Sequence, residues 1–145
     1  MYILDTDHIS ILDRGGINAK KLLNRLADVN PDDVVVTIIS YEEQTKGWLS
    51  YLAKARKPEA QVEIYRQLKD QIESYCSVPI IDFDMEAAQE FQRLRKLYPR
   101  LGTMDLKIAA IAIVNDAVIL TRNISDFGQV QNLKLEDWTR WRISL

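Results

Sequence analysis

The sequence predicts one three-layer α/β/α sandwich domain with a mostly parallel central sheet of about five strands. Short β-branched runs alternate with longer segments of helical periodicity, which is typical of βαβ units. Residues 34–39 are β-branched and apolar on both faces, as expected of a strand that is covered on both sides. A length of 145 residues suits a single domain with its own core, so we expect the domain to span 1–145.

Apolar runs indicate where the strands of this sheet lie. We expect them, in chain order, at Tyr2–Leu4, 34–39, 78–81 and 117–121, with a short fifth strand at 133–135. Pro79 has no backbone N–H, so the third strand is expected to begin there or to lie at an edge of the sheet.

Helical periodicity, N-cap residues and prolines indicate the helices between the strands. They are expected at 6–12, across Leu22 to Leu26 with an end near Asn30, from Ser40 to about residue 75 with a break near Pro58, at 84–98, and from Thr103 onward. Ser40 as N-cap with Glu43 at the third helical position fits a capping box. Thr103 is the expected N-cap of the last helix.

Charge and composition restrict the classes of function. A formal net charge of −2 argues against a protein that grips nucleic acid by bulk positive charge, although an acidic nuclease site remains compatible with it. The longest apolar stretch, 108–114, is far shorter than the ~20 residues of a membrane span. We also see no signal peptide, and we therefore expect a cytoplasmic protein without membrane contact.

Acidic residues recur where the predicted strands end. Asp5 follows the first strand, Glu43 follows the second, Asp105 opens the helix before the fourth, and Asp126 follows the fourth with Asn123 before it. Because ligands of parallel sheets bind beyond the carboxyl ends of the strands, these residues are expected to share one rim. Clustered carboxylates repel one another, and a set without Cys or His support suits Mg²⁺ or Mn²⁺.

Each acid also has a local explanation when it is taken alone. Asp5 is able to cap the helix that follows, Glu43 completes the capping box, Asp105 suits a helix N-terminus, and Asp126 suits a turn. Asp7 is expected to cap the short first helix or to support the site indirectly. These explanations leave the metal site a hypothesis at this point.

His8 and the tryptophans have two interpretations each. His8 is expected at the helix start or on the surface, with general-base catalysis as the minority alternative. Trp48, Trp138 and Trp141 are expected to pack in the core or in a dimer interface, with base stacking as the alternative.

Four ordered stretches give the sequence a family resemblance. "YILDTDHIS", "ISYEEQTKG", "GTMDLKIAAIAI" and "ILTRNISDF" resemble the four motifs of PIN-domain ribonucleases, specifically the VapC-type toxins of bacterial toxin–antitoxin pairs. In the second motif the acid stands four residues before a glycine, which selects Glu43, with Gly47, over Glu42. The chain departs from the family's "T-x-D" pattern at Asn123, where many relatives carry Asp.

The resemblance implies a parallel five-stranded sandwich and Mg²⁺- or Mn²⁺-dependent endonuclease action on RNA. It also implies a homodimer and a small antitoxin protein that covers the acidic pocket. In this sequence Asp5 and Asp105 would hold the principal metal, with Glu43 and Asp126 or Asn123 completing the set. Further roles are ligand orientation by Thr6 and Thr121 and substrate contact by Arg122.

Two other functions remain open from the sequence. "ILDTD" also matches the start of a haloacid-dehalogenase-like phosphatase, in which Asp5 would be the nucleophile and Asp7 the acid/base. A non-catalytic PIN-like binding module is the second alternative, because Asn123 weakens the metal set.

Overall fold

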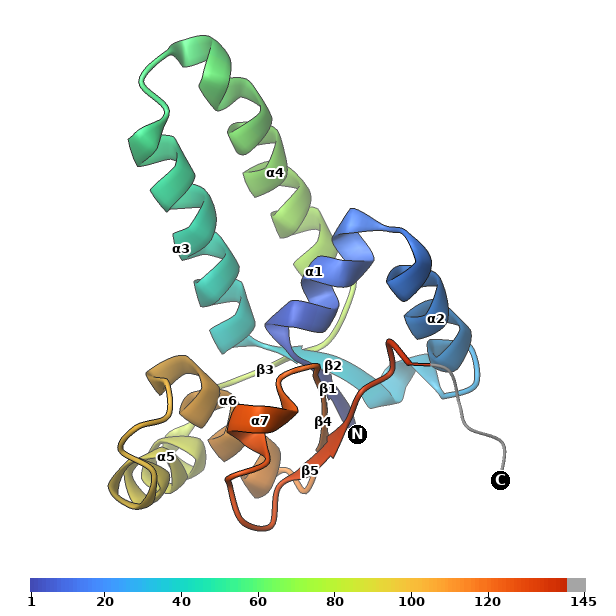
Figure 1. The fold of residues 1–145 in the computed structure, drawn as a ribbon, viewed down its shortest axis with the longest axis vertical. Helices are drawn as coiled ribbons and strands as arrows, with labels where there is room; N and C mark the ends of the chain where they lie inside the picture. The colour runs from blue at the N-terminus through green and yellow to red at the C-terminus, as the bar shows by residue number, and fades with distance from the viewer. Residues whose placement is uncertain (141–145) are drawn as a thin grey trace.

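The computed structural model describes residues 1–140, which form a parallel five-stranded sheet in the order β3-β2-β1-β4-β5 (Figure 1). The strands are β1 (Tyr2–Leu4), β2 (Val34–Thr37), β3 (Ile80–Ile81), β4 (Val118–Leu120) and β5 (Lys134–Glu136). Every strand pair is parallel. The predicted fold class is therefore confirmed, and β3 lies at an edge, as Pro79 indicated.

The helices cover both faces of this sheet. They are α1 (Thr6–Arg14), α2 (Ile17–Leu26), α3 (Ile38–Lys54), α4 (Pro58–Cys76), α5 (Met85–Leu97), α6 (Thr103–Val114) and α7 (Ile124–Phe127), with a 3₁₀ turn at Pro31–Asp33. Ile3 and Ile119 face the core that contains α5 and α6, whereas Leu4 and Leu120 face the core that contains α1 and α2. Alternate residues of each strand thus pack into separate cores on the two faces of the sheet, which gives the three-layer arrangement.

The position of β1 fixes where a ligand site lies. The chain runs from β1 outward to β2 and β3, and later returns to add β4 and β5 on the other side of β1. The connection that follows β1 therefore runs to one side of the sheet, and the connection that follows β4 runs to the other. In open parallel sheets, ligands bind at the point between two such strands. The Asp5 N–H donates to the Leu120 carbonyl at 3.0 Å, so the ends of these two strands are held together.

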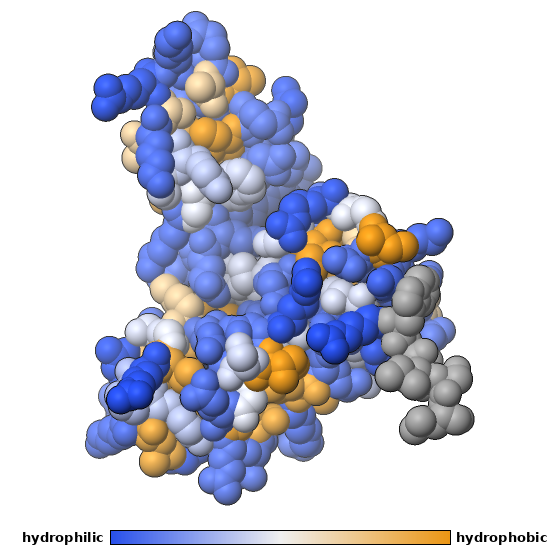
Figure 2. Space-filling view, in the orientation of Figure 1, coloured by the Kyte–Doolittle hydropathy of each residue, from blue (hydrophilic) through white to orange (hydrophobic). Residues whose placement is uncertain are grey.

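Helices α3 and α4 form a long hairpin, here called the arm, that projects from the rest of the domain (Figure 1). The arm begins right after β2, and the predicted break falls at Pro58, the first residue of α4. Hydrophilic side chains cover most of its visible surface, with apolar ones in separate patches (Figure 2). No helix within residues 1–140 is both long and apolar enough to cross a membrane.

Two predicted N-caps are wrong. β2 ends at Thr37 rather than residue 39, and the Thr37 hydroxyl accepts the Ser40 N–H at 3.2 Å, so Thr37 is the N-cap of α3. The predicted capping box therefore does not form, because another hydroxyl residue stands three positions before Ser40. Gly102, rather than Thr103, is the N-cap of α6.

Candidate active site

Asp5 is a buried carboxylate at the carboxyl end of β1. It is 5% exposed and accepts a hydrogen bond from the Thr121 hydroxyl at 2.8 Å. Burial, with added repulsion from the charges of Asp7 and Asp105, raises the pKa of Asp5 to about 7. A carboxylate this costly to ionise is typical of a functional site.

Asp7 lies two residues further on but has the opposite electrostatic character. Its oxygens accept from the His8 ring at 2.8 Å, the Arg122 N–H at 2.9 Å and the Thr121 hydroxyl at 3.1 Å. Burial alone would raise the pKa of Asp7, but these donors outweigh it and the pKa is lowered. Asp7 therefore connects α1 to the end of β4. The predicted role of Asp7 as a cap of α1 is not the one that the structure shows.

His8 is fully buried, so the predicted surface position is wrong. The Trp138 N–H donates to its Nε2 at 3.2 Å, which leaves the ring proton on Nδ1, facing Asp7. The apolar face of α1 directs this side chain inward, where both of its nitrogens find partners. His8 thus has a structural role beside the rim and no free nitrogen for general-base catalysis.

Glu43 comes to the rim from the first turns of α3. It accepts from the Thr6 hydroxyl at 2.9 Å, and the Ser40 hydroxyl lies 2.9 Å from the same Thr6 oxygen. Burial, together with the charges of Asp105, Glu42 and Asp7, raises the pKa of Glu43 even though the Thr6 bond lowers it. Thr6 therefore links the beginnings of α1 and α3.

Asp105, Asn123 and Asp126 form the other side of the rim. The Asn123 side-chain N–H₂ group lies 3.4 Å from Asp105 and 3.2 Å from Asp126. Burial, then the charges of Asp126 and Asp7, raise the pKa of Asp105. Asp126 lies in α7, a four-residue helix that begins after Asn123, whereas the sequence indicated a loop. The amide of Asn123 thus bridges two carboxylates, those of Asp105 and Asp126.

The rim, defined as Asp5, Glu43, Asp105, Asn123 and Asp126, has a donor set that fits a hard divalent cation. Within residues 1–140, no ion pair is formed by any of its four carboxylates. In the same part of the chain, no three carboxylates, histidines or cysteines are placed so that they could hold a metal together. Mg²⁺ is commonly bound by one or two carboxylates with water and phosphate, so the set remains suitable for it.

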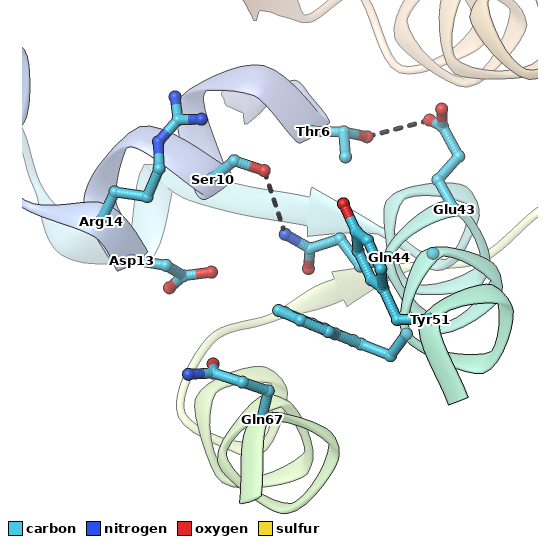
Figure 3. A pocket seen from close by; sticks show the side chains of 10 residues that line it. Thr6, Ser10, Asp13, Arg14, Glu43, Gln44, Tyr51 and Gln67 are labelled. Carbon is cyan, nitrogen blue, oxygen red and sulfur yellow. Dashed lines mark hydrogen bonds between the residues drawn. The ribbon is translucent and has the colours of Figure 1, made fainter. Parts of the chain in front are cut away.

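A pocket of about 630 Å³ opens beside the rim, between α1 and the arm helices α3 and α4. Its walls are formed by Thr6, Ser10, Asp13, Arg14, Glu43, Gln44, Gly47, Trp48, Tyr51 and Gln67. Figure 3 shows Ser10, Asp13 and Arg14 of α1 facing side chains of α3, with Gln67 of α4 on a third side. Thr6 and Glu43 belong to both the pocket and the rim.

The sequence interpretation missed most of these pocket residues. The missed residues of α1, which are Ser10, Asp13 and Arg14, recur with Thr6 at helical spacing on one face of that helix, and this spacing was the available signal. Each of these side chains alone reads as an ordinary solvated residue, and only the packing of α1 against the arm brings them into a common wall.

The tryptophans differ in their surroundings. Trp138 is 2% exposed and its ring centroid lies 4.8 Å from that of Tyr2, so it packs in the core as predicted. Trp48 is only half-buried and lines the pocket. Trp141 lies outside the described residues.

Known proteins resemble this chain over nearly all of its length. A model of the PIN domain family matches residues 2–133. Ribonuclease VapC1 of Haemophilus influenzae (strain R2866) is 26% identical over 141 residues, which cover 97% of this chain and 99% of the relative.

Two solved structures share the fold. VapBC2 from Rickettsia felis, bound to a DNA fragment from the promoter, matches with a TM-score of 0.70 and 26% identity, covering 94% of this chain and 98% of the other. VapBC-5 from Mycobacterium tuberculosis, a member of the VapBC family of toxin–antitoxin systems, matches with a TM-score of 0.60 and 23% identity, covering 93% and 94%.

Proposed function

The chain belongs to the PIN domain family, and on this basis we propose that it is an endoribonuclease and the toxin of a toxin–antitoxin pair. The similarity to Ribonuclease VapC1 over both chains supports hydrolysis of RNA phosphodiester bonds. The similarity to VapBC2 supports a small antitoxin protein as partner. The proposal includes a homodimer in the cytoplasm and a single domain over 1–145.

The observation that carries this proposal is the gathering of carboxylates from four chain segments at the ends of β1 and β4. Burial, with repulsion from neighbouring carboxylates as a smaller cause, raises the pKa values of Asp5, Glu43 and Asp105. A divalent cation would offset the cost of ionising these groups. We propose Asp5 and Asp105 as the principal ligands of Mg²⁺ or Mn²⁺, with Glu43, Asp126 and Asn123 completing the set directly or through bound water. When bound, such a cation activates water and stabilises charge on the phosphate.

Neighbouring side chains position these ligands. Thr121 holds Asp5 through its hydroxyl, and Thr6 holds Glu43 in the same way. Arg122 is exposed and shares a hollow of about 500 Å³ with Arg14, Asp7 and Asn123. Two guanidinium groups beside the rim are suited to contact the phosphates of an RNA strand.

The phosphatase alternative loses support from Asp7. That chemistry requires Asp7 to deliver and remove a proton, whereas its pKa is lowered and three donors occupy its oxygens. The binding-module alternative keeps one supporting observation, which is the amide of Asn123 at a position where the family pattern has a carboxylate.

The proposed function is tested by incubating the purified protein with an RNA pool in Mg²⁺, in Mn²⁺ and in EDTA. Wild type is expected to cleave only with a metal, and Asp5→Asn and Asp105→Asn are expected to lose cleavage. Asp32→Asn is a matched control, because Asp32 is exposed at the opposite end of β2. Unchanged cleavage in Asp5→Asn and Asp105→Asn would overturn the site, and antitoxin binding without any cleavage would favour the binding module.

A further inference from the structure

The pocket beside the rim has a chemical character that metal binding does not explain. Its residues come from α1, α3 and α4 and include two aromatic rings as well as amide, hydroxyl and charged groups. Building on the proposed function, we propose that this pocket binds one unpaired RNA base next to the phosphodiester that is cut. The pocket would thereby determine the base preference of cleavage.

The pocket and the rim are continuous. Thr6 and Glu43 line the pocket and also form the 2.9 Å hydrogen bond at the rim. A nucleotide whose phosphate lies at the rim therefore has its base within reach of the pocket. A volume of about 630 Å³ lies within the range of small-molecule sites, which is roughly 300–1,000 Å³.

Two aromatic rings provide a stacking surface. The ring centroids of Trp48 and Tyr51 are 5.9 Å apart with an interplanar angle of 46°. Tyr51 is 58% exposed, so its ring is available to a ligand. Stacking of a base on an aromatic side chain is worth about 1–3 kcal/mol and tolerates any base.

Polar groups beside and across from these rings supply discrimination. Gln44 is fixed, because its side-chain oxygen accepts from the Tyr75 hydroxyl at 2.8 Å and its nitrogen lies 3.5 Å from the Ser10 hydroxyl. The Asp13 carboxylate comes from α1, across the pocket from α3 (Figure 3). A carboxylate accepts hydrogen bonds from exocyclic amines, so guanine, adenine and cytosine should be preferred over uracil.

Gly47 is the residue that the fold alone does not explain. It lies one helical turn after Glu43 within α3, where glycine costs about 1 kcal/mol relative to alanine. A Cβ at this position would meet nothing within 4 Å, so no packing requirement excludes a side chain. Because Gly47 lines the pocket, its missing side chain keeps space open beside the rim.

Arg14 connects the pocket to the surface beyond the rim. It lines the pocket and also the hollow that contains Arg122 and Asn123. A strand with one base in the pocket thus has a cationic side chain available for a neighbouring phosphate. This combination of stacking rings, amide groups and phosphate-binding cations fits an RNA strand better than an antitoxin peptide, which is the competing occupant.

The decisive variant is Gly47→Leu, which fills the pocket without removing any group that contacts RNA or metal. Leucine is a better helix former than glycine, so the melting temperature should stay the same or rise. Ala53→Leu is the matched control, because Ala53 is exposed on the same helix and does not line the pocket. Trp48→Ala removes one ring, with Tyr65→Ala as control for an exposed ring elsewhere on the arm.

Each variant is assayed for melting temperature and for KM and kcat on RNA hairpins with randomised loops. Ultraviolet crosslinking of the same RNA in EDTA, followed by peptide mapping, reports base contact without cleavage. Gly47→Leu and Trp48→Ala should raise KM about 10-fold or more and lose a crosslink at Trp48 or Tyr51, with both controls unchanged. Asp13→Asn should reduce the discrimination against uracil.

The two proposals fail in different ways. Wild type that cleaves nothing in Mg²⁺ or Mn²⁺ refutes the proposed function, and crosslinking still decides whether the pocket holds a base. Wild-type KM and crosslinks in both Gly47→Leu and Trp48→Ala would overturn the base site. Loss of antitoxin binding in these variants with unchanged RNA cleavage would likewise overturn it, in favour of a peptide.

Discussion

The two sides of the rim differ in how firmly their acids are held. At the ends of β1 and β4, Asp5 accepts from the Thr121 hydroxyl at 2.8 Å. Asp7, which lies beside the rim, accepts from His8, Arg122 and Thr121 at 2.8 to 3.1 Å and fixes the same strand ends. On the α6 and α7 side, Asp105 and Asp126 share one amide of Asn123 at 3.4 and 3.2 Å. The strand side is therefore preorganised. The helix side is held only by longer contacts from the neutral amide of Asn123.

This difference indicates a division of labour. The buried, hydrogen-bonded Asp5 offers a fixed oxygen, since sheet pairing and Thr121 determine its position. Asp105 and Asp126 repel each other and would move inward when a cation replaces the amide bridge. The strand side would thus set the position of the metal, and the helix side would adjust to it.

The largest expected effect compares one acid from each side. Asp5→Asn should lower kcat/KM for RNA by at least about 10³-fold, or about 4 kcal/mol of barrier, because the fixed ligand is lost. Asp126→Asn should lower it only about 10-fold, since Asp105 and Asn123 remain. Asp7→Asn should also cost much less than Asp5→Asn. Steady-state cleavage assays in Mn²⁺ measure all three, and equal losses would remove the distinction between the sides.

The stability of the metal-free protein should depend on pH through Asp5. The pKa of Asp5 is about 7 in the folded protein against an ordinary value of 3.8, so the folded state binds its proton more tightly than the unfolded state. The contribution of Asp5 to the free energy of unfolding is therefore fully present below pH 4, and it is lost as the pH rises to about 7. At 1.36 kcal/mol per pKa unit, the loss over this shift is on the order of 4 kcal/mol.

Thermal denaturation in EDTA between pH 4 and pH 8 checks this dependence. In Asp5→Asn the melting temperature should depend much less on pH, because the amide does not titrate. Asp32→Asn should keep the pH dependence of wild type. A wild-type melting temperature that rises across this interval would show that Asp5 is not the dominant titrating group.

Thr121→Val tests the hydrogen bonds of the strand side. The hydroxyl is fully buried, contacts both Asp5 and Asp7, and accepts the Asn123 N–H at 2.9 Å. Valine has a similar shape but leaves these groups unpaired, so unfolding should become easier by about 1–3 kcal/mol. Urea denaturation measures the change, and a variant as stable as wild type would mean that water replaces the hydroxyl at no cost.

The smallest expected effect concerns the helix side. Asn123→Asp restores the carboxylate of the family pattern and adds a third charge beside Asp105 and Asp126. Mn²⁺ should bind about 3- to 10-fold more tightly, while the metal-free protein should melt at a slightly lower temperature. Calorimetric titration with Mn²⁺ decides this, and weaker binding would mean that Asn123 contributes more as an amide.

The sequence predicted the sheet and the shared edge of the acids because both follow from simple periodicities. Because the carboxyl ends of parallel strands share one edge of a sheet, Asp5 and Asp126 could be assigned to one rim from the sequence. The sequence did not predict the strand order, which makes β1 and β4 neighbours. The start of α3 was misread because Thr37 continues a β-branched run that also fits a strand. Local propensity did not distinguish the last strand residue from the N-cap.

The surroundings of His8 and Trp48 were beyond the reach of sequence patterns. His8 is buried because Trp138, 130 positions away, donates a backbone N–H to its ring. Trp48 and Trp138 are chemically identical, and only the packing of the arm against α1 leaves one beside a pocket. Such differences arise from long-range contacts that no local window contains.

Thermal stabilisation by Mn²⁺ tests whether Asp5 anchors a divalent cation at the rim. At 100 times its Kd, a ligand that binds only the folded state stabilises it by about 2.7 kcal/mol, or roughly 5–10 °C in a chain of this size. Wild type and Asp32→Asn should show this rise at pH 7, and Asp5→Asn should show little or none. An equal rise in Asp5→Asn would contradict the account.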